Sequence, residues 1–183
     1  DEMEDIYVAN QWLDKEALSK IKKIVIGDGI TQIGNYVFAG CTNLQDIVFP
    51  QKTLKRINDY SFSGCSSLKE FIVPEGIDSL GEGFLYDCLS IEKISFPSTL
   101  KEIPCFTSDG GELPKLRSVV LAEGIEKIAN GAFCHYKNLK TIILPSTLKE
   151  IGEYAFDYSG FVEITIPSNL RKVTRRAFEG DTN

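Results

Sequence analysis

The sequence predicts an α/β solenoid, a fold built from stacked coils, and three observations lead to this class. A unit seen most clearly at 139–156, LKTIILPSTLKEIGEYAF, recurs with a spacing of 22 to 25 residues. Its apolar positions form columns from copy to copy, and proline or glycine follows them at matching places. The seven copies begin at Ile21, Leu44, Leu68, Ile91, Leu116, Leu139 and Phe161.

Each copy is expected to start with a short strand, such as Thr141–Leu144, in which inward apolar residues alternate with outward ones. A proline often follows and ends the strand, because proline has no amide hydrogen. One coil cannot bury its apolar residues alone, but stacked coils turn each column into a continuous ladder. The fourth position of the copies is apolar throughout and reads Ile24, Ile47, Phe71, Ile94, Val119, Ile142 and Ile164. The sixth position, Ile166 in the last copy, is expected to point inward as well.

The remainder of each copy is predicted to turn and return to the next strand. A brief extended piece ends near Gly34, Gly81 or Gly152, where glycine suits a tight corner with positive φ. The last part carries large apolar residues, and we expect a helical turn or a short 3₁₀ piece there. These residues are Phe38, Phe62, Leu85, Phe133, Phe156 and Phe178.

Two regions depart from the repeat. Residues 1–20 precede the repeats of 21–183, and we expect them to cap the first coil with a helix over Asp14–Lys20 and with Trp12 packed in the cap. In the fourth copy, Pro104–Lys115 contains Asp-Gly-Gly, a strong turn signal, and should bulge from the stack with Phe106 folded inward. We read this bulge as a tolerated insertion or, alternatively, as a functional loop. At the other end, 179–183 is either a minimal cap or a point from which the array continues.

The motif L-x-x-I-x-I-P followed by L-x-x-I-G-x-x-A-F-x-G-C resembles the BspA-type leucine-rich repeat, and the resemblance covers Ile21 to about Phe178. Several copies depart from it. The third has Phe84 and Leu85 in place of Ala-Phe, and the fourth lacks the A-F-x-G-C segment. In the last three copies the Cys is replaced by Tyr136, Ser159 and Asp181. The resemblance implies a right-handed leucine-rich-repeat array of seven coils, with a parallel sheet on its concave face and short turns on its convex side. It also implies a cell-surface or secreted bacterial or protozoan protein that binds other proteins, in some members a host matrix protein.

Composition narrows the function further. The net charge is −6 with a pI near 4.9, which argues against binding nucleic acid or anionic membranes, since both need basic surfaces. No apolar run approaches the ~20 residues that a membrane-spanning helix needs. Localisation at the cell surface or outside the cell therefore follows from the family resemblance alone.

The cysteines and the single histidine are the candidates for chemistry. Cys41, Cys65 and Cys88 occupy the same place in three successive copies, and we expect free thiols that pack as small apolar groups. A disulfide within this column would be strained, because the side chains point the same way. Cys134 and His135 are adjacent, but no third group orients them as a nucleophilic pair. We therefore expect no enzyme activity, no metal site and no cofactor.

The fifth position of each copy should point into solvent on the concave side, between columns of charged residues. Exposed β-branched residues in a column indicate a contact surface for a protein partner, such as a host extracellular matrix or plasma protein. Alternatively, the preference of sheets for β-branched residues accounts for the column, and the array is a structural spacer or scaffold. The predicted contact residues are Val25, Val48, Ile72, Ser95, Val120, Ile143 and Thr165, flanked by Glu70 and Lys93.

Overall fold

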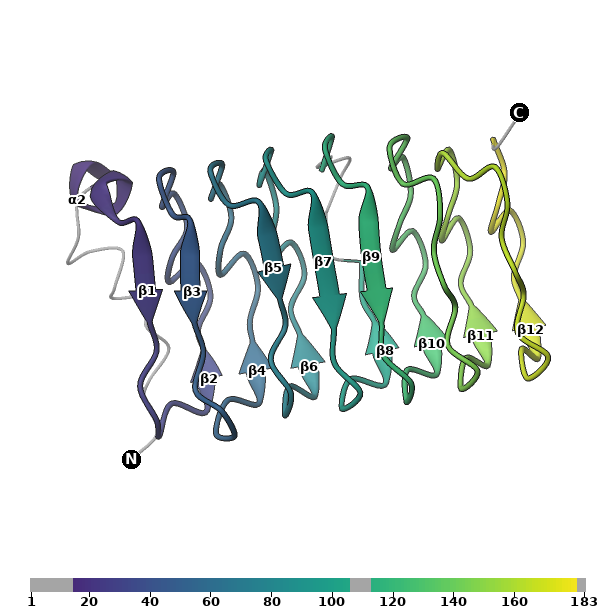
Figure 1. The fold of residues 1–183 in the computed structure, drawn as a ribbon, viewed down its shortest axis with the longest axis horizontal. Coiled ribbons are helices and arrows are strands. Elements are labelled where there is room, and N and C mark those ends of the chain that lie inside the picture. Colours follow the sequence, from purple (N-terminus) through teal and green to yellow (C-terminus); the bar gives the residue numbers. More distant parts are fainter. Residues whose placement is uncertain (1–14, 106–112, 181–183) are drawn as a thin grey trace.

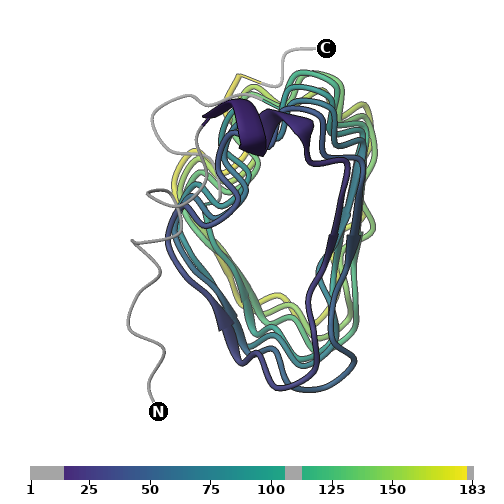
Figure 2. The same ribbon diagram turned by 90° about the vertical axis from the view of Figure 1, so that its left-hand side faces the viewer.

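The structure is a computed structural model that describes residues 15–105 and 113–180 of the chain. The chain winds into a parallel β-solenoid whose coils stack side by side along one axis (Figure 1). Viewed along that axis, each coil is a flattened loop with strands on two opposite sides and turns closing the ends (Figure 2). The predicted solenoid is therefore present, and nearly all of its regular structure is strand.

One side of the stack carries the first strand of each coil, and we call this series the first ladder. Its strands pair in parallel and in register, so that Ile24 faces Ile47 and Ile94 faces Val119, with most of these fourth-position residues buried. The ladder consists of two separate sheets, one with two strands and one with three. Its strands are β1 (Lys23–Val25), β3 (Asp46–Val48), β5 (Glu70–Ile72), β7 (Lys93–Phe96) and β9 (Ser118–Leu121).

The opposite side carries a second ladder that the sequence did not predict as a sheet. In the described part of the chain, the brief extended pieces of neighbouring coils pair in parallel in two sheets, one of three strands and one of four, with no pairing between the third and fourth strands of the ladder. Among the described residues, seven such strands occupy the same place in successive coils, so the chain makes six full turns between the first and the last. The expected seventh coil runs into residues 181–183, outside the described part. The strands are β2 (Gln32–Ile33), β4 (Arg56–Ile57), β6 (Ser79–Leu80), β8 (Glu102–Ile103), β10 (Lys127–Ile128), β11 (Glu150–Ile151) and β12 (Lys172–Val173).

The predicted strand at Thr141–Leu144 is wrong, since the structure assigns no strand there. Ile142 and Leu144 are nevertheless buried, so the apolar alternation correctly identified the inward side chains. Burial alone does not make a strand, and the regular pairing of this coil with its neighbours runs through the second ladder. In the next coil, Ile166 was expected to point inward but is 45% exposed, because no described coil follows to cover it.

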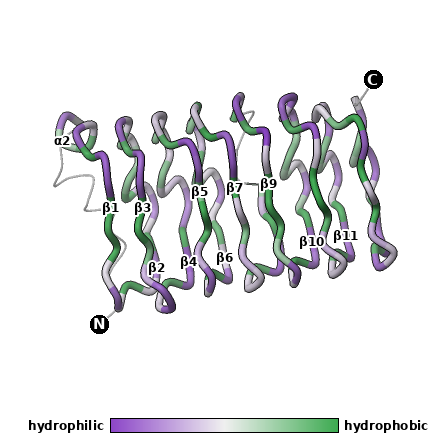
Figure 3. Tube along the Cα trace, viewed as in Figure 1, coloured by the Kyte–Doolittle hydropathy of each residue, from purple (hydrophilic) through white to green (hydrophobic). Residues whose placement is uncertain are grey.

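The segments with the large apolar residues form hydrogen-bonded turns, and no 3₁₀ helix is assigned among the described residues. Positive φ angles recur about every four residues in these turns, for example at Tyr36 and Gly40, and such angles interrupt a helix. The rings still form the predicted inner column. Phe156 stacks between Phe133 and Phe178, with ring centroids 5.4 and 5.3 Å away. Hydrophobic segments recur at the same level of successive coils (Figure 3).

The corner glycines have a different role from the one predicted. Gly34, Gly81 and Gly152 are not among the residues with positive φ. Instead, a Cβ added to Gly152 would lie 2.6 Å from the carbonyl carbon of Ala129, and one added to Gly81 would lie 2.4 Å from that of Asn58. Glycine is therefore needed because the backbone of one coil passes directly against the backbone of the preceding coil.

The described N-terminal element is helix α2 (Lys15–Lys20), which confirms most of the helix expected there. Leu18 is buried in the core, and the Asn43 side chain donates a hydrogen bond to the Ser19 carbonyl oxygen at 2.7 Å. The helix thus packs on the first coil. Asp14, Trp12 and the rest of the expected cap lie outside the described residues, as does Phe106 of the expected bulge, so these interpretations stay predictions.

Side chains also join each coil to the next. The Glu123 carboxylate accepts hydrogen bonds from the amide and hydroxyl of Ser146, which hold the pKa of Glu123 below its usual value. The Thr147 hydroxyl accepts from the Gly124 amide and donates to the Ile125 carbonyl. The same contacts recur two coils earlier between Glu75 and Ser98. In the third to sixth copies, Glu-Gly therefore alternates with Ser-Thr, and each Glu-Gly pair binds the Ser-Thr pair of the next coil.

The cysteine column has a similar linking function. The cysteines at 41, 65 and 88 are free thiols and are fully buried. Cys88 donates from its thiol to the Phe62 carbonyl at 3.1 Å, and in a later coil Ser159 makes the equivalent bond to the Phe133 carbonyl at 2.7 Å. Hydrogen bonding with the thiols of its neighbours, together with burial, raises the pKa of Cys65 far above the usual range. The Cys65 thiol is therefore unionised.

Candidate functional site

The fifth-position residues point outward, as the sequence predicts, and we call them the outward column. The first five lie on strands of the first ladder, and Ile143 and Thr165 follow in coils to which no strand is assigned at this position. The most exposed are Ile143, at 85%, and Val25, at 67%. Register pairs place Val25 beside Val48, and Ile72, Ser95 and Val120 side by side. The outward column comprises Val25, Val48, Ile72, Ser95, Val120, Ile143 and Thr165, and all are exposed except the half-buried Ser95.

Ion pairs between neighbouring strands flank the outward column. Lys23 pairs with Asp46 and Lys93 pairs with Glu70, each at 2.6 Å between nitrogen and oxygen. These pairs are substantially exposed, so each is worth little in stability, on the order of 0–1 kcal/mol. They neutralise one another across the strands, which leaves the apolar column as the dominant feature of this face.

The first ladder is interrupted between β3 and β5, a feature that sequence reasoning missed. β3 pairs only with β1, and β5 pairs with β7, so β3 and β5 share no hydrogen-bonded register. The two strands visibly stand farther apart than β1 and β3 do (Figure 1). Continued pairing in register would set Asp46 directly opposite Glu70, and like charges in that position are destabilising. The signal was present in the sequence as two carboxylates in one column of successive copies.

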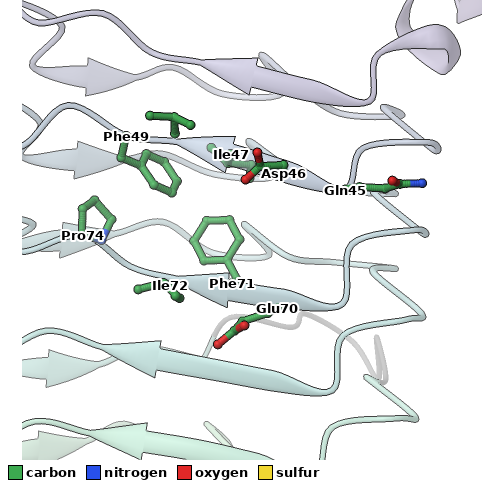
Figure 4. A pocket seen from close by; sticks show the side chains of 9 residues that line it. Gln45, Asp46, Ile47, Phe49, Glu70, Phe71, Ile72 and Pro74 are labelled. Carbon is green, nitrogen blue, oxygen red and sulfur yellow. The ribbon is translucent and has the colours of Figure 1, made fainter.

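A groove of about 450 Å³ occupies this interruption, and we call it the β3–β5 groove. Two rings form its floor: Phe49 and Phe71 meet edge to face with centroids 5.7 Å apart (Figure 4). Phe71 is fully buried and Phe49 partly so. The groove is lined by Gln45, Asp46, Ile47, Val48, Phe49, Glu70, Phe71, Ile72 and Pro74.

The candidates for catalysis do not form a reactive pair. The His135 ring stacks on Tyr158 with centroids 5.3 Å apart. The Cys134 sulfur lies 4.0 Å from a carboxylate oxygen of Asp157, and burial together with that charge raises the pKa of Cys134 to about 11. Cys134 is therefore a protonated thiol at neutral pH, and a thiol is a poor nucleophile.

The described ranges contain neither a cluster of metal-binding side chains nor a helix long enough to span a membrane. No group of three His, Cys, Asp or Glu side chains in residues 15–105 and 113–180 is arranged to hold a metal ion. Within the same ranges, the longest helix has six residues and falls far short of the length needed to cross a bilayer.

Comparison with known proteins identifies the family to which this repeat belongs. The model of the BspA type leucine rich repeat region matches six copies, over residues 16–108 and 112–183. The chain belongs to the BspA-type leucine-rich repeat family. The columns described above are therefore the repeat positions of that family, and the family is one of repeat proteins with a solenoid scaffold.

Several solved bacterial structures share the fold. A leucine-rich repeat protein from Eubacterium ventriosum has a TM-score of 0.80 at 24% identity, covering 90% of this chain and 44% of its own. One from Treponema pallidum has a TM-score of 0.64 at 26% identity, covering 77% and 66%. One from Bacteroides ovatus has a TM-score of 0.52 at 25% identity, covering 87% and 58%. This BspA-type chain thus spans less than two thirds of each. No curated protein matches it.

Proposed function

We propose that this chain is a non-enzymatic protein-recognition module of a cell-surface or secreted protein, and that the outward column of the first ladder is its contact surface. The observation that carries the proposal is the exposure of apolar β-branched residues along one face, including Ile72 at 57% and Val120 at 46%. Contiguous exposed apolar residues on a folded domain are typical of contact sites.

The physical setting favours binding to a folded or extended protein segment. β-Branched side chains have few rotamers, so they lose little conformational entropy when a partner covers them. They project from strands paired in register, and the partner would therefore meet a preorganised surface. A host extracellular matrix or plasma protein is the class of partner that the family resemblance suggests, and exposure to such a partner requires localisation at or outside the cell surface.

The experiment is a binding screen of the chain against a panel of extracellular matrix and plasma proteins. The variant Ile72→Asp with Val120→Asp places charge in the outward column, and its circular dichroism must match that of the wild type. The control is Gln32→Asp with Ser79→Asp, which adds the same charges to the second ladder on either side of Arg56. The proposal predicts a partner that the first variant loses and the control keeps; retention by both would refute it.

The alternative is a structural spacer or scaffold within a larger surface protein. Ion pairs that join successive coils of the second ladder favour it, because they stiffen the stack without offering an apolar face. Lys127 binds Glu102 at 2.7 Å and Lys172 binds Glu150 at 2.8 Å. A spacer would show no partner in the panel, and the full-length protein would keep its activity when the outward column carries charge.

A further inference from the structure

We propose that the β3–β5 groove binds an extended segment of the partner protein that presents an arginine or lysine followed, two residues later, by an apolar residue. This inference rests on the proposed protein-recognition function and assigns the binding of one partner segment to the β3–β5 groove. The segment would enter as an additional strand at the interruption of the first ladder.

The first argument comes from backbone pairing. β3 has a strand partner only on its β1 side, and β5 only on its β7 side, so each presents an edge to the groove. Unpaired strand edges are templates for an added strand, and recognition by strand addition uses such edges. The second ladder remains continuous behind the groove, since Arg56 pairs with Ser79 and Ile57 with Leu80. The coils are thus held together on one side while they separate on the other.

The second argument comes from charge. Asp46 and Glu70 are bound by lysines on their far sides, through one carboxylate oxygen each, Oδ2 and Oε1. In the described part of the chain, the other oxygen of each carboxylate has no hydrogen bond. A guanidinium or ammonium group of the partner, placed in the groove, would donate hydrogen bonds to these remaining oxygens. Charge-assisted hydrogen bonds of this kind are about twice as strong as neutral ones.

The third argument is the order of polar and apolar residues. Side chains two apart on a strand share one face, so Asp46 precedes Val48 and Glu70 precedes Ile72 on the same surface. A parallel segment with a basic residue and then an apolar one matches both strands at once. The apolar side chain would lie outward beside Val48 and Ile72, and the residue before it would point inward toward the rings of Phe49 and Phe71. The groove volume lies in the range of about 300–1,000 Å³ typical of ligand sites.

The test is a titration of the ¹⁵N-labelled chain with the capped peptide Thr-Thr-Arg-Thr-Val-Thr-Thr, followed by amide chemical shifts. The expected shifts are confined to residues 45–49 and 70–73. Asp46→Asn with Glu70→Gln should weaken binding by about tenfold or more. The control, Glu102→Gln with Glu150→Gln on the second ladder, should leave it unchanged. A peptide with glutamate in place of arginine should not bind.

Three results would overturn the inference: no shifts at millimolar peptide, shifts spread along the whole first ladder, or equal binding of the arginine and glutamate peptides. The groove and the proposed function can fail separately. A partner from the panel that Val120→Asp abolishes, while Asp46→Asn with Glu70→Gln has no effect, would keep the outward column and reject the groove. If the peptide binds only in the groove and Val120→Asp leaves binding of the panel partner unchanged, the groove is supported and the outward column is rejected.

Discussion

Replacing Gly152 with alanine tests the claim that the corner glycines exist for close approach between coils. The new Cβ would lie 2.6 Å from the carbonyl carbon of Ala129 and 2.6 Å from the Asn130 amide nitrogen, both backbone atoms. Ordinary contacts start near 3.4 Å, so the two backbones must separate by roughly 0.8 Å. That movement would lengthen the bonds from the Gly152 amide to the Ile128 carbonyl and from the Glu153 amide to Asn130, now 2.9 and 2.8 Å.

The magnitude follows from two opposing effects. Overpacking costs about 1–3 kcal/mol, and weakening two hydrogen bonds adds about 1 kcal/mol. Because φ at Gly152 is not positive, alanine gains about 0.4–1 kcal/mol by restricting the unfolded chain. The net loss in the free energy of unfolding is about 1–3.6 kcal/mol. For a chain of this length, that loss lowers the Tm by about 2–14 °C.

The assay is urea denaturation and thermal melting followed by circular dichroism, with Gly27→Ala as the matched control. A Cβ at Gly27 would meet nothing within 4 Å, and its φ is not positive. The control should therefore gain about 0.4–1 kcal/mol. If Gly152→Ala were as stable as the wild type, the close-approach explanation of the corner glycines would be wrong.

Three further predictions concern single side chains. Cys88→Ser should keep the bond to the Phe62 carbonyl, as Ser159 does in a later coil, and Cys88→Ala should be about 1 kcal/mol less stable than Cys88→Ser in urea denaturation. Asp157 is buried with one carboxylate oxygen unpaired, so Asp157→Ala should raise the free energy of unfolding by about 1 kcal/mol, and a loss would contradict this reading. The depressed pKa of Glu123 contributes stability above its ordinary pKa near 4.5, and this contribution disappears as pH falls through the lower folded-state pKa. The Tm of Glu123→Gln should therefore fall less steeply below about pH 4.5 than that of the wild type, and parallel profiles would count against it.

The solenoid could be predicted from the sequence because the residues that become buried repeat at fixed intervals along the chain. Ile24, Phe71 and Ile94 could each be assigned inward from their column, and the outward column followed from strand alternation. The second ladder was missed because its strands have two residues each, as in Gln32–Ile33, and two residues show no periodicity. Such short strands form only because the neighbouring coil offers the same piece in register.

The β3–β5 groove was missed for a different reason. The apolar columns that predict the strands carry no information about the charges of Asp46 and Glu70 beside them. Whether two strands of a solenoid pair depends on which residues meet across the stack, and a carboxylate opposite a carboxylate opposes pairing. The role of the corner glycines was missed for the same reason. The close approach of Gly152 to Ala129 is a contact between coils, and the pattern within one copy does not show it.

Photo-crosslinking from the outward column tests the central claim most directly. A benzoylphenylalanine at Ile143, the most exposed member of the column, should crosslink to a partner from the binding panel. The same residue at Ser79, which is exposed on the outer face of the second ladder, should not. Crosslinking from Ile143 alone is the predicted result. Crosslinking from Ser79 alone would place recognition on the opposite side of the stack and contradict the account.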